Sequence, residues 1–596
     1  MNPQQLLAYF DRISNAPDAV PRLRRFILDL AVRGKLVEQV PNDPPASDLF
    51  KRIKSERADN SSARRKQAEF TAIGDSDLPF KVPVGWSWLR FGSIHELVRG
   101  VTYTKSDVSE TPVTGHLPIL RANNIGTSLN LDELVFVRKE CIGAEQMLRR
   151  GDYLIALSSG SKNLVGKAAF VAADYDAGFG GFCGVIRLFT PSLEQFVGIF
   201  LSSRLYRDAI SAGSRGIGIN NLKRETLDHI LFPLPPVAEQ SRIVAKVAEL
   251  MALCDRLEAA QAERESWRSQ LVAASLDQLN QPAGPGAAET FGEHAQFYLS
   301  HLPRLTTRPE HIRQLRQTIL NLAFHGRLVP QRVNEGSGSE LLKRLDVAHP
   351  DRREPGRHHR ESRRAINPSI SPGPYELPSN WNWTSLDSIC EQIADVDHNM
   401  PKAVPDGVPF ISAKDLKDDG TIDFSNPKMI SEEDYKRLSR KVQIRRGDIV
   451  YSRIGARLGK ARLVEVDIRF LISYSCCLVR PLHEFIHKGY LQLFLNSTLA
   501  LRQAHTGTQS IGVPDLGLAE IKRFQIPIPP LPEQHRIAAR VDELMALCER
   551  LEKQLTTAQT ESRRLLESVL EEALNGDPPP DRDLGRENSA QRPPGT

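Results

Sequence analysis

Long hydrophobic runs are missing from this chain of 596 residues. No apolar stretch approaches the ~20 residues that a membrane span needs, and the first twenty residues carry acidic side chains and lack the apolar core of a secretion signal. The seven cysteines form no Cys-x-x-Cys pair, which argues against a zinc site and a disulfide framework. These absences predict a soluble cytoplasmic protein with no membrane partner.

A large excess of either charge is also missing, because the formal net charge is only +5. Any contact with nucleic acid must therefore come from a local basic surface. The chain is 40% hydrophobic and 25% charged, which is ordinary for a globular protein, and its length suggests three to five structural units, at roughly 100–200 residues each.

Catalytic motifs are the third absence. The segments GSKNLVGKA (160–168) and GARLGKA (455–461) have the wrong glycine spacing for a phosphate loop, and alanine follows the lysine where Mg²⁺ binding needs Ser or Thr. The segment NDPP (42–45) lacks the aromatic residue that follows the two prolines in amino-methyltransferases. We therefore expect no catalytic residue, metal or cofactor in this chain.

What the sequence does contain is a tandem duplication. LRRFILDLAVRGKLV (23–37) returns as LRQTILNLAFHGRLV (315–329), and PLPPVAEQ (233–240) returns as PIPPLPEQ (527–534). Three further motifs repeat in the same order: Trp-x-Trp at 86–88 and 381–383, Arg-Arg-Gly-Asp at 149–152 and 445–448, and the nine residues from 249 and 543. Between these motifs, residues 90–230 and 385–525 share only scattered identical residues. We therefore expect a repeated framework that holds two domains with different recognition surfaces. An old duplication with relaxed loops remains the alternative.

Residues 237–278 and 531–574 have apolar side chains at helical spacing and predict two helices, each ~60 Å long. We expect them to pair antiparallel, although packing of each helix on its own domain fits the same stripe. Further helical patterns lie at 193–211 and 485–506, and short β-rich runs lie at 152–157 and 448–451. The candidate residues of the helix pair or of subunit docking are Ile243, Leu250, Leu257, Ile537, Leu544 and Leu551.

Three pairs of polar loops occupy matching positions in the two halves and carry different side chains. Gly, Ser, Arg and Lys suit phosphate oxygens, and Asn, Gln and Arg suit base edges. A polar surface turn is the alternative for each loop. The candidate DNA-binding residues are Arg121, Asn123, Asn124, Ser158, Ser159, Ser161, Lys162, Lys167, Ser214, Arg215, Asn220, Asn221 and Lys223 in the first half, and Lys414, Ser452, Arg453, Arg457, Lys460, Thr506, Thr508, Gln509 and Ser510 in the second.

The predicted fold class is mixed α/β, with two α/β reading domains joined by two long helices. The predicted parts are a helical segment and linker (1–76), a first reading domain (77–236), a central helical region (237–349), a basic linker (350–374), a second reading domain (375–530), a distal long helix (531–575) and a disordered tail (576–596). The charged stretches 54–76 and 350–374 are expected to be solvated linkers, and contact of their basic residues with DNA phosphate is the alternative.

Residues 20–575 resemble the specificity subunits of type I restriction–modification systems. Three motifs carry this resemblance, and each is present twice: the Gly-Lys/Arg-Leu-Val segment, the Pro-Pro-x-x-Glu-Gln helix start and Trp-x-Trp. The resemblance implies that each middle region is a target recognition domain for one half of a bipartite, asymmetric DNA site, and that the helices set the spacer. It also implies two methyltransferase (modification) subunits, which carry S-adenosylmethionine, and restriction subunits that use ATP and Mg²⁺. A stand-alone methyltransferase or nuclease, and a helical scaffold with two protein-binding domains, are the competing hypotheses.

Overall fold

The computed structural model describes residues 16, 18–59, 73–161, 164–213, 220–281, 287–350, 373–398, 400–508 and 514–575. The chain divides into two compact units: unit 1 comprises residues 1–263 and 559–596, and unit 2 comprises residues 264–558. The long helix α7 (Val237–Asn280) begins in unit 1 and ends in unit 2, whereas α16 (Leu531–Asn575) begins in unit 2 and ends in unit 1. Both helices predicted from the apolar stripes are therefore confirmed, within two residues at each end.

Unit 1 contains a four-stranded antiparallel sheet in the order β2-β10-β6-β8 and a second sheet in the order β3-β5-β4-β9, in which β4 and β9 are parallel. A separate pair, β1 with β12, sets Trp88 opposite Pro233 and so joins two of the repeated motifs. The strands are β1 (Ser87–Arg90), β2 (His95–Arg99), β3 (Val108–Ser109), β4 (His116–Leu120), β5 (Val135–Arg138), β6 (Tyr153–Ala156), β7 (Ser158–Ser159), β8 (Ala168–Phe170), β9 (Gly178–Phe179), β10 (Cys183–Leu188), β11 (Asn220–Asn221) and β12 (Leu231–Leu234).

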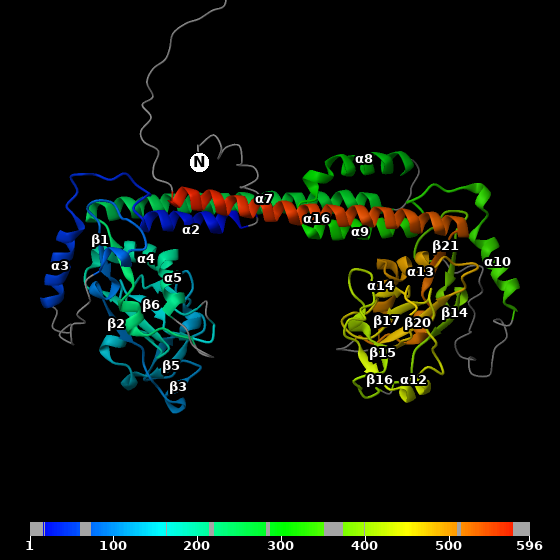
Figure 1. The fold of residues 1–596 in the computed structure, drawn as a ribbon, viewed down its shortest axis with the longest axis horizontal. Coiled ribbons are helices and arrows are strands. Elements are labelled where there is room, and N and C mark those ends of the chain that lie inside the picture. The colour runs from blue at the N-terminus through cyan, green and yellow to red at the C-terminus, as the bar shows by residue number, and fades with distance from the viewer. Residues whose placement is uncertain are drawn as a thin grey trace, which may run out of the picture. The chain divides into compact units, whose positions relative to one another are not determined.

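Helices α4 and α5 lie between α2 and the strands of unit 1, as Figure 1 shows. Their apolar faces enter a core in which Phe91, Phe200 and Phe232 contact one another. The start of α7 packs on the same core. The helices are α2 (Ala19–Val32), α3 (Ala46–Asp59), α4 (Glu194–Ser202), α5 (Arg204–Gly213) and α6 (Arg224–Asp228).

Unit 2 repeats this arrangement. Its four-stranded sheet has the order β14-β20-β17-β18, a three-stranded sheet has the order β16-β15-β19, and β13 pairs with β21 so that Trp383 lies opposite Pro527. The strands are β13 (Asn382–Ser385), β14 (Cys390–Ala394), β15 (Val408–Ile411), β16 (Lys428–Ile430), β17 (Ile449–Ser452), β18 (Ala461–Leu463), β19 (Leu471–Ile472), β20 (Cys476–Pro481) and β21 (Gln525–Ile528).

The helices of unit 2 follow the same plan, with α13 and α14 packed against α9. Helix α8 covers the end of α7 through Tyr298 and Leu305, which join Val272, Leu276 and Leu279 in a separate cluster. The helices are α8 (Ala287–Leu305), α9 (Pro309–Phe324), α10 (Gly338–Ala348), α11 (Leu386–Ile389), α12 (Glu432–Leu438), α13 (Lys488–Leu495), α14 (Thr498–Thr506) and α15 (Leu518–Lys522).

In each unit one short helix contacts both long helices. In unit 1, Arg24 of α2 binds Glu258 of α7 at 2.6 Å, and Arg22 binds Glu567 of α16. In unit 2, Arg316 of α9 binds Glu552 of α16 at 2.9 Å, and Thr318 of α9 accepts a hydrogen bond from Asn280 of α7 at 3.2 Å. Helices α2 and α9 contain the first ten residues of the two copies of the repeated 23–37 motif, so this motif lies where the helical segments meet.

Two predictions about secondary structure need correction. The helical patterns 193–211 and 485–506 each form two helices, because Ser203 and Ser497 interrupt them, each donating its hydroxyl to a carbonyl three residues earlier. The stretch 54–76 is not linker throughout, since α3 continues to Asp59, and buried Leu49 and Ile53 explain its stability. The predicted linker 350–374 and the tail from residue 576 lie mostly outside the described residues.

Candidate nucleic-acid interface

In unit 1, the structure brings two of the predicted loops together. Strand β7 follows β6 directly and pairs with β11, so Ser158 lies opposite Asn221 and Ser159 opposite Asn220. The Ser158 hydroxyl donates to Asn221 Oδ1 at 2.8 Å. The loop after β6 and the loop after α5 therefore form one polar edge.

The corresponding loops of unit 2 also meet. Ile454 forms an isolated bridge with Asp515, and the Gly455 amide donates to the Pro514 carbonyl at 2.9 Å. Ser475 connects this edge to the third loop, because its hydroxyl accepts from the Ala413 amide at 3.2 Å and its carbonyl accepts from the Arg453 amide at 2.9 Å. All three predicted loops are thus neighbours within the unit.

Unit 1 joins its third loop to the others by the same route. The Gly180 amide donates to the Leu120 carbonyl at 2.9 Å, next to Arg121, and the Ser158 amide donates to the Phe182 carbonyl at 3.0 Å. The segment Gly180–Phe182 therefore links the third loop to the edge formed by β7 and β11. The shared backbone route explains why the loops occupy matching positions although their side chains differ.

Arg453 and Ser452, which were predicted to contact DNA, hold the loops of unit 2 together. Arg453 is 3% exposed, and its guanidinium donates to Asp515 at 2.9 Å, Asp395 at 2.8 Å and the Leu516 carbonyl at 3.0 Å. Ser452 is fully buried, and its hydroxyl donates to the Arg457 carbonyl. Both side chains make hydrogen bonds within unit 2, and their contact with DNA stays a prediction.

Asn124 also makes its hydrogen bonds inside its own unit. It is 1% exposed, its Oδ1 accepts from the Arg121 amide at 2.8 Å, and its Nδ2 donates to the Asn130 carbonyl at 2.9 Å. In unit 2, Asp415 takes the corresponding role by accepting from the Ser412 amide at 2.8 Å. Asn124 and Asp415 therefore stabilise the same turn in the two units, although the residue types differ.

The remaining candidates divide by exposure. Lys460 forms an ion pair with Asp418, Arg457 donates to the Leu416 carbonyl at 2.9 Å, and the hydroxyls of Thr506 and Thr508 donate to nearby helical carbonyls. Lys162, Ser214, Arg215, Gln509, Ser510 and the side chain of Asn220 lie outside the described residues. The exposed candidates are Asn123, Ser161, Asn221, Lys223, Lys414 and Thr506, and the half-buried ones are Arg121, Ser158, Ser159, Lys167, Arg457, Lys460 and Thr508.

Phe182 is a residue that the sequence reading missed. Its side chain is 71% exposed, and its backbone accepts hydrogen bonds from both Leu157 and Ser158 at the loop edge. An exposed aromatic ring at such an edge can contact a thymine methyl group or a sugar. The preceding pair Gly180-Gly181 was the signal, because two glycines before an aromatic residue mark a turn that presents it.

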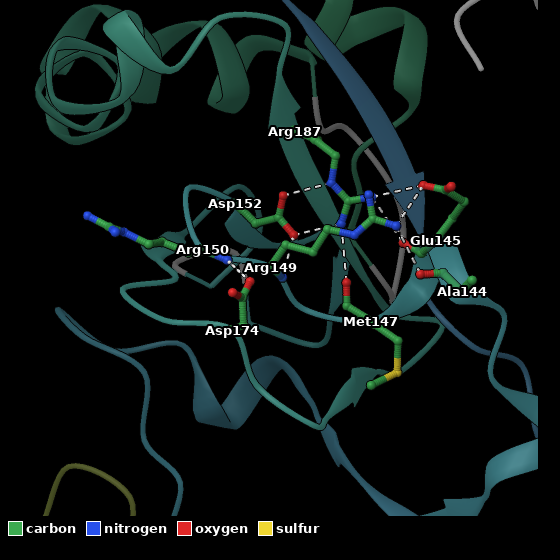
Figure 2. A network of polar contacts seen from close by, with 8 residues as sticks. All are labelled: Ala144, Glu145, Met147, Arg149, Arg150, Asp152, Asp174 and Arg187. Atoms are coloured by element: carbon green, nitrogen blue, oxygen red, sulfur yellow. Dashed lines mark hydrogen bonds and ion pairs between the residues drawn. The ribbon is translucent and has the colours of Figure 1, made fainter. Parts of the chain in front are cut away.

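A buried ion pair joins the two central strands of each sheet at the end opposite the loop edge. Arg187 of β10 donates from Nε and Nη2 to the two carboxylate oxygens of Asp152 at 2.8 and 2.7 Å, and Glu145 binds the same guanidinium, as Figure 2 shows. In unit 2, Arg480 binds Asp448 with the same geometry, at 2.7 and 2.8 Å. These contacts fix the two central strands of each sheet to one another, and the loops follow at the other end of the same strands.

The repeated Arg-Arg-Gly-Asp motif is explained by this pair. Gly151 and Gly447 adopt φ values of 90° and 95°, which L side chains rarely adopt. The Asp152 carboxylate also accepts from the Arg149 amide at 3.0 Å, and the Asp448 carboxylate from the Arg445 amide at 2.6 Å. The motif is therefore a turn that delivers a buried acid to the arginine of the neighbouring strand.

The predicted helix-pair residues occupy another place. Ile243 and Ile537 are fully buried, but each belongs to the hydrophobic core of its own unit's domain, and Leu250, Leu544 and Leu551 pack at the margins of the same cores. Leu257 is 37% exposed. Ile243, Leu250, Ile537, Leu544 and Leu551 therefore fit the alternative that the first part of each long helix packs on its own domain, and the docking role stays a prediction.

A repeated joint holds the start of each long helix. In unit 1, the buried Glu239 carboxylate accepts from Trp86 Nε1 at 2.9 Å and from Gln39 Nε2 at 2.7 Å. Burial raises the pKa of Glu239, and burial likewise raises the pKa of its counterpart Glu533. Asn380 donates to Glu533 at 3.3 Å. The glutamate of Pro-Pro-x-x-Glu-Gln therefore attaches the domain to its helix.

Within the described part of the chain, no three or more His, Cys, Asp or Glu side chains gather in a way that could hold a metal ion. The helices described there include none with the length and hydropathy needed to cross a membrane.

Comparisons with known proteins found one family match over part of the chain and similar proteins over most of its length. Residues 378–558 match the family described as the type I restriction modification DNA specificity domain. The chain is 26% identical to the EcoAI specificity subunit of Escherichia coli, over 93% of this chain and 94% of that protein, and 26% identical to the EcoEI specificity subunit over the same shares. Among solved structures, the HsdS subunit from Thermoanaerobacter tengcongensis is 19% identical, with a TM-score of 0.39 over 84% of this chain and 99% of that one.

These matches make the chain similar to DNA specificity proteins. More particularly, residues 378–558, which lie in unit 2, match the DNA specificity domain, and the chain over most of its length is similar to type I restriction enzyme specificity subunits.

Proposed function

We propose that the chain reads a bipartite, asymmetric site in double-stranded DNA, with one target recognition domain in unit 1 and another in unit 2. The observation that carries this proposal is the pair of loop edges. Both edges are built by the same strand order and the same backbone contacts, yet they present unlike side chains, such as Asn123 in one unit and Lys414 at the corresponding exposed position. Two domains with the same backbone arrangement and different exposed side chains suit two half-sites of different sequence.

The two long helices act in this proposal as an antiparallel spacer. Helix α7 passes from unit 1 to unit 2 and α16 passes from unit 2 to unit 1, so their chain directions are opposed. Forty-four and forty-five residues correspond to ~65 Å of helix at 1.5 Å per residue. Two half-sites read from one face of a duplex need centres about one helical turn apart, or a multiple of it.

The chain also serves in this proposal as a non-catalytic assembly subunit in the cytoplasm. Its relatives are subunits of type I restriction enzymes, so we propose that it binds two modification subunits, which carry S-adenosylmethionine, and restriction subunits that use ATP and Mg²⁺. The matched helical segments around α2 and α9 are the surfaces that the two halves share, and they suit two copies of one partner.

Selection of bound duplexes from a randomised pool tests the proposal. The purified chain, alone and with its modification subunit, should enrich two different short sequences at a fixed separation. Enrichment of one continuous sequence, of a palindrome, or of no sequence would contradict it. Binding should also weaken steeply with added salt, because phosphate contacts release counterions.

A further inference from the structure

The end of each long helix is capped by a basic residue from the other copy of the repeat. In unit 1, Lys35 Nζ donates to the carbonyl of Leu574, the penultimate residue of α16, at 2.9 Å. In unit 2, Arg327 Nη1 donates to the carbonyl of Leu279, the penultimate residue of α7, at 3.2 Å, and also contacts the Gln281 carbonyl. Lys35 and Arg327 are the same position of the repeated Gly-Lys/Arg-Leu-Val motif.

Both helices need a cation at this place. The last four carbonyls of a helix lack an internal partner, and the helix dipole puts partial negative charge there. Neither α7 nor α16 has a basic residue in its own last turn. The cap is therefore supplied from outside the helix, in both units, by the motif that follows α2 or α9.

A continuous chain of contacts joins each cap to the start of the other long helix. In unit 1, the carbonyl of Gly34, next to Lys35, accepts from Gln39 Nε2 at 3.2 Å, and the same amide group donates to Glu239 of α7 at 2.7 Å. Trp86, at the beginning of the recognition domain, donates to the other oxygen of Glu239 at 2.9 Å. The end of α16, the start of α7 and the domain thus meet in one joint.

Unit 2 contains a corresponding joint with the helices exchanged, in which Asn380 takes the part of the donor to the glutamate. The Gly326 carbonyl accepts from Gln331 Nε2 at 3.1 Å, and Asn380 donates to Glu533 at 3.3 Å. Glu533 lies in the first turn of α16, and Arg327 caps α7. Each unit therefore ties the start of one long helix to the end of the other.

The glycine before each cap explains the fixed geometry. Gly34 and Gly326 adopt φ values of 67° and 68°, and a Cβ there would lie 2.5 Å from Pro83 Cγ and 2.4 Å from Pro378 Cγ. The backbone is pressed against the proline and tryptophan of the domain entrance, so the cap cannot shift along the helix without moving the domain.

We propose that Lys35 and Arg327 are positioning residues that fix where α16 and α7 end against the two recognition domains, and thereby set the spacer that the chain accepts. This inference rests on the proposed function. Loss of a cap lets the last turn fray and frees the joint, so that other separations of the half-sites become accessible. A partly buried charge at a helix end is worth about a fivefold change in an equilibrium constant, and two caps should act additively.

The experiment uses the full chain with duplexes that carry the selected half-sites at the selected spacer, and at one base pair fewer and more. Lys35→Met, Arg327→Met and the double variant are compared with wild type. Each single substitution should reduce the preference for the selected spacer about fivefold, and the double variant more, while affinity for the best duplex changes less. Lys35→Arg and Arg327→Lys, which exchange the residues that the two copies use, should keep the preference.

Two further variants separate positioning from general stability. Lys51→Met removes an exposed lysine whose partner is Asp48 on its own helix, and it should change nothing. Gln39→Leu keeps both caps but breaks the link to Glu239, and it should also lower the spacer preference. An equal loss of affinity at every spacer in the methionine variants would overturn the inference. A wild-type chain without any spacer preference would overturn the proposed function, and this inference with it.

Discussion

Arg187 binds Asp152 through two parallel hydrogen bonds, and the arginine side chain is 17% exposed while the aspartate is 2% exposed. Removal of one partner of such a pair leaves a buried charge without compensation, which costs about 3 kcal/mol. We expect Asp152→Asn to lower the free energy of unfolding by about this amount in urea titrations, and Asp448→Asn to do the same for the Arg480 pair. Asp208→Asn is the control: its ion pair with Arg204 is exposed, so the loss should stay below about 0.5 kcal/mol. Equal effects of all three substitutions would contradict this assignment.

Gly34 and Gly326 should not tolerate a side chain. Alanine at either position would meet the neighbouring proline at less than 3 Å in a backbone conformation that favours glycine. We expect Gly34→Ala and Gly326→Ala each to destabilise the chain by about 2 kcal/mol, measured by urea or thermal unfolding. Gly292, on the exposed side of α8, has nothing within 4 Å of its Cβ position, so Gly292→Ala should raise stability by about 0.5–1 kcal/mol. The expected result is a lower stability for Gly34→Ala and Gly326→Ala and a higher stability for Gly292→Ala.

The buried glutamates predict a specific dependence of stability on pH. Burial raises the pKa of Glu239 and Glu533 above the ordinary value of 4.5 in the folded chain. The folded state then binds more protons than the unfolded state, so these groups lower stability as pH rises from 4.5 through the raised folded pKa. The difference in unfolding free energy between wild type and Glu239→Gln should change across this interval and be constant above it. A constant difference from pH 4 to pH 8 would contradict the pKa direction.

Lys414 and Arg453 should separate DNA binding from folding, although both were predicted as DNA contacts. Lys414 is exposed on a turn, whereas Arg453 is 3% exposed and bound to two aspartates. We expect Lys414→Ala to keep the unfolding free energy and to weaken DNA binding, with a reduction of about one in the slope of log affinity against log salt if the lysine contacts phosphate. Arg453→Leu should instead lower stability by about 2–3 kcal/mol. Unchanged binding by Lys414→Ala would remove that residue from the interface.

The long helices, the mixed α/β class and the duplicated order of motifs could be predicted because they depend on local periodicity and repetition. The roles of single polar residues could not. Asn124 and Lys414 both follow a strand in a polar turn, and only the folded contacts distinguish a buried turn residue from an exposed lysine. Ile243 and Ile537 have the spacing of a helix seam, but that spacing equally suits a domain core, where they lie.

The basic residue of Gly-Lys/Arg-Leu-Val shows the same limit. The sequence marks Lys35 and Arg327 as a repeated position, yet their partners Leu574 and Leu279 lie in a different copy of the repeat. A repeat found by comparison of the halves predicts equivalent roles, and it carries no information about which half supplies the contact.

The most direct measurement of the central claim changes the length of the spacer. Seven residues are removed from each long helix at matching positions, 259–265 in α7 and 553–559 in α16, and the variant is assayed on duplexes that carry both selected half-sites at every spacer from zero to twelve base pairs. Removal of seven residues shortens a helix by about 10 Å, which corresponds to roughly three base pairs of duplex. The account predicts an optimum about three base pairs shorter than that of wild type. An optimum unchanged at wild-type affinity would contradict the claim that the helices set the distance between two DNA-reading surfaces.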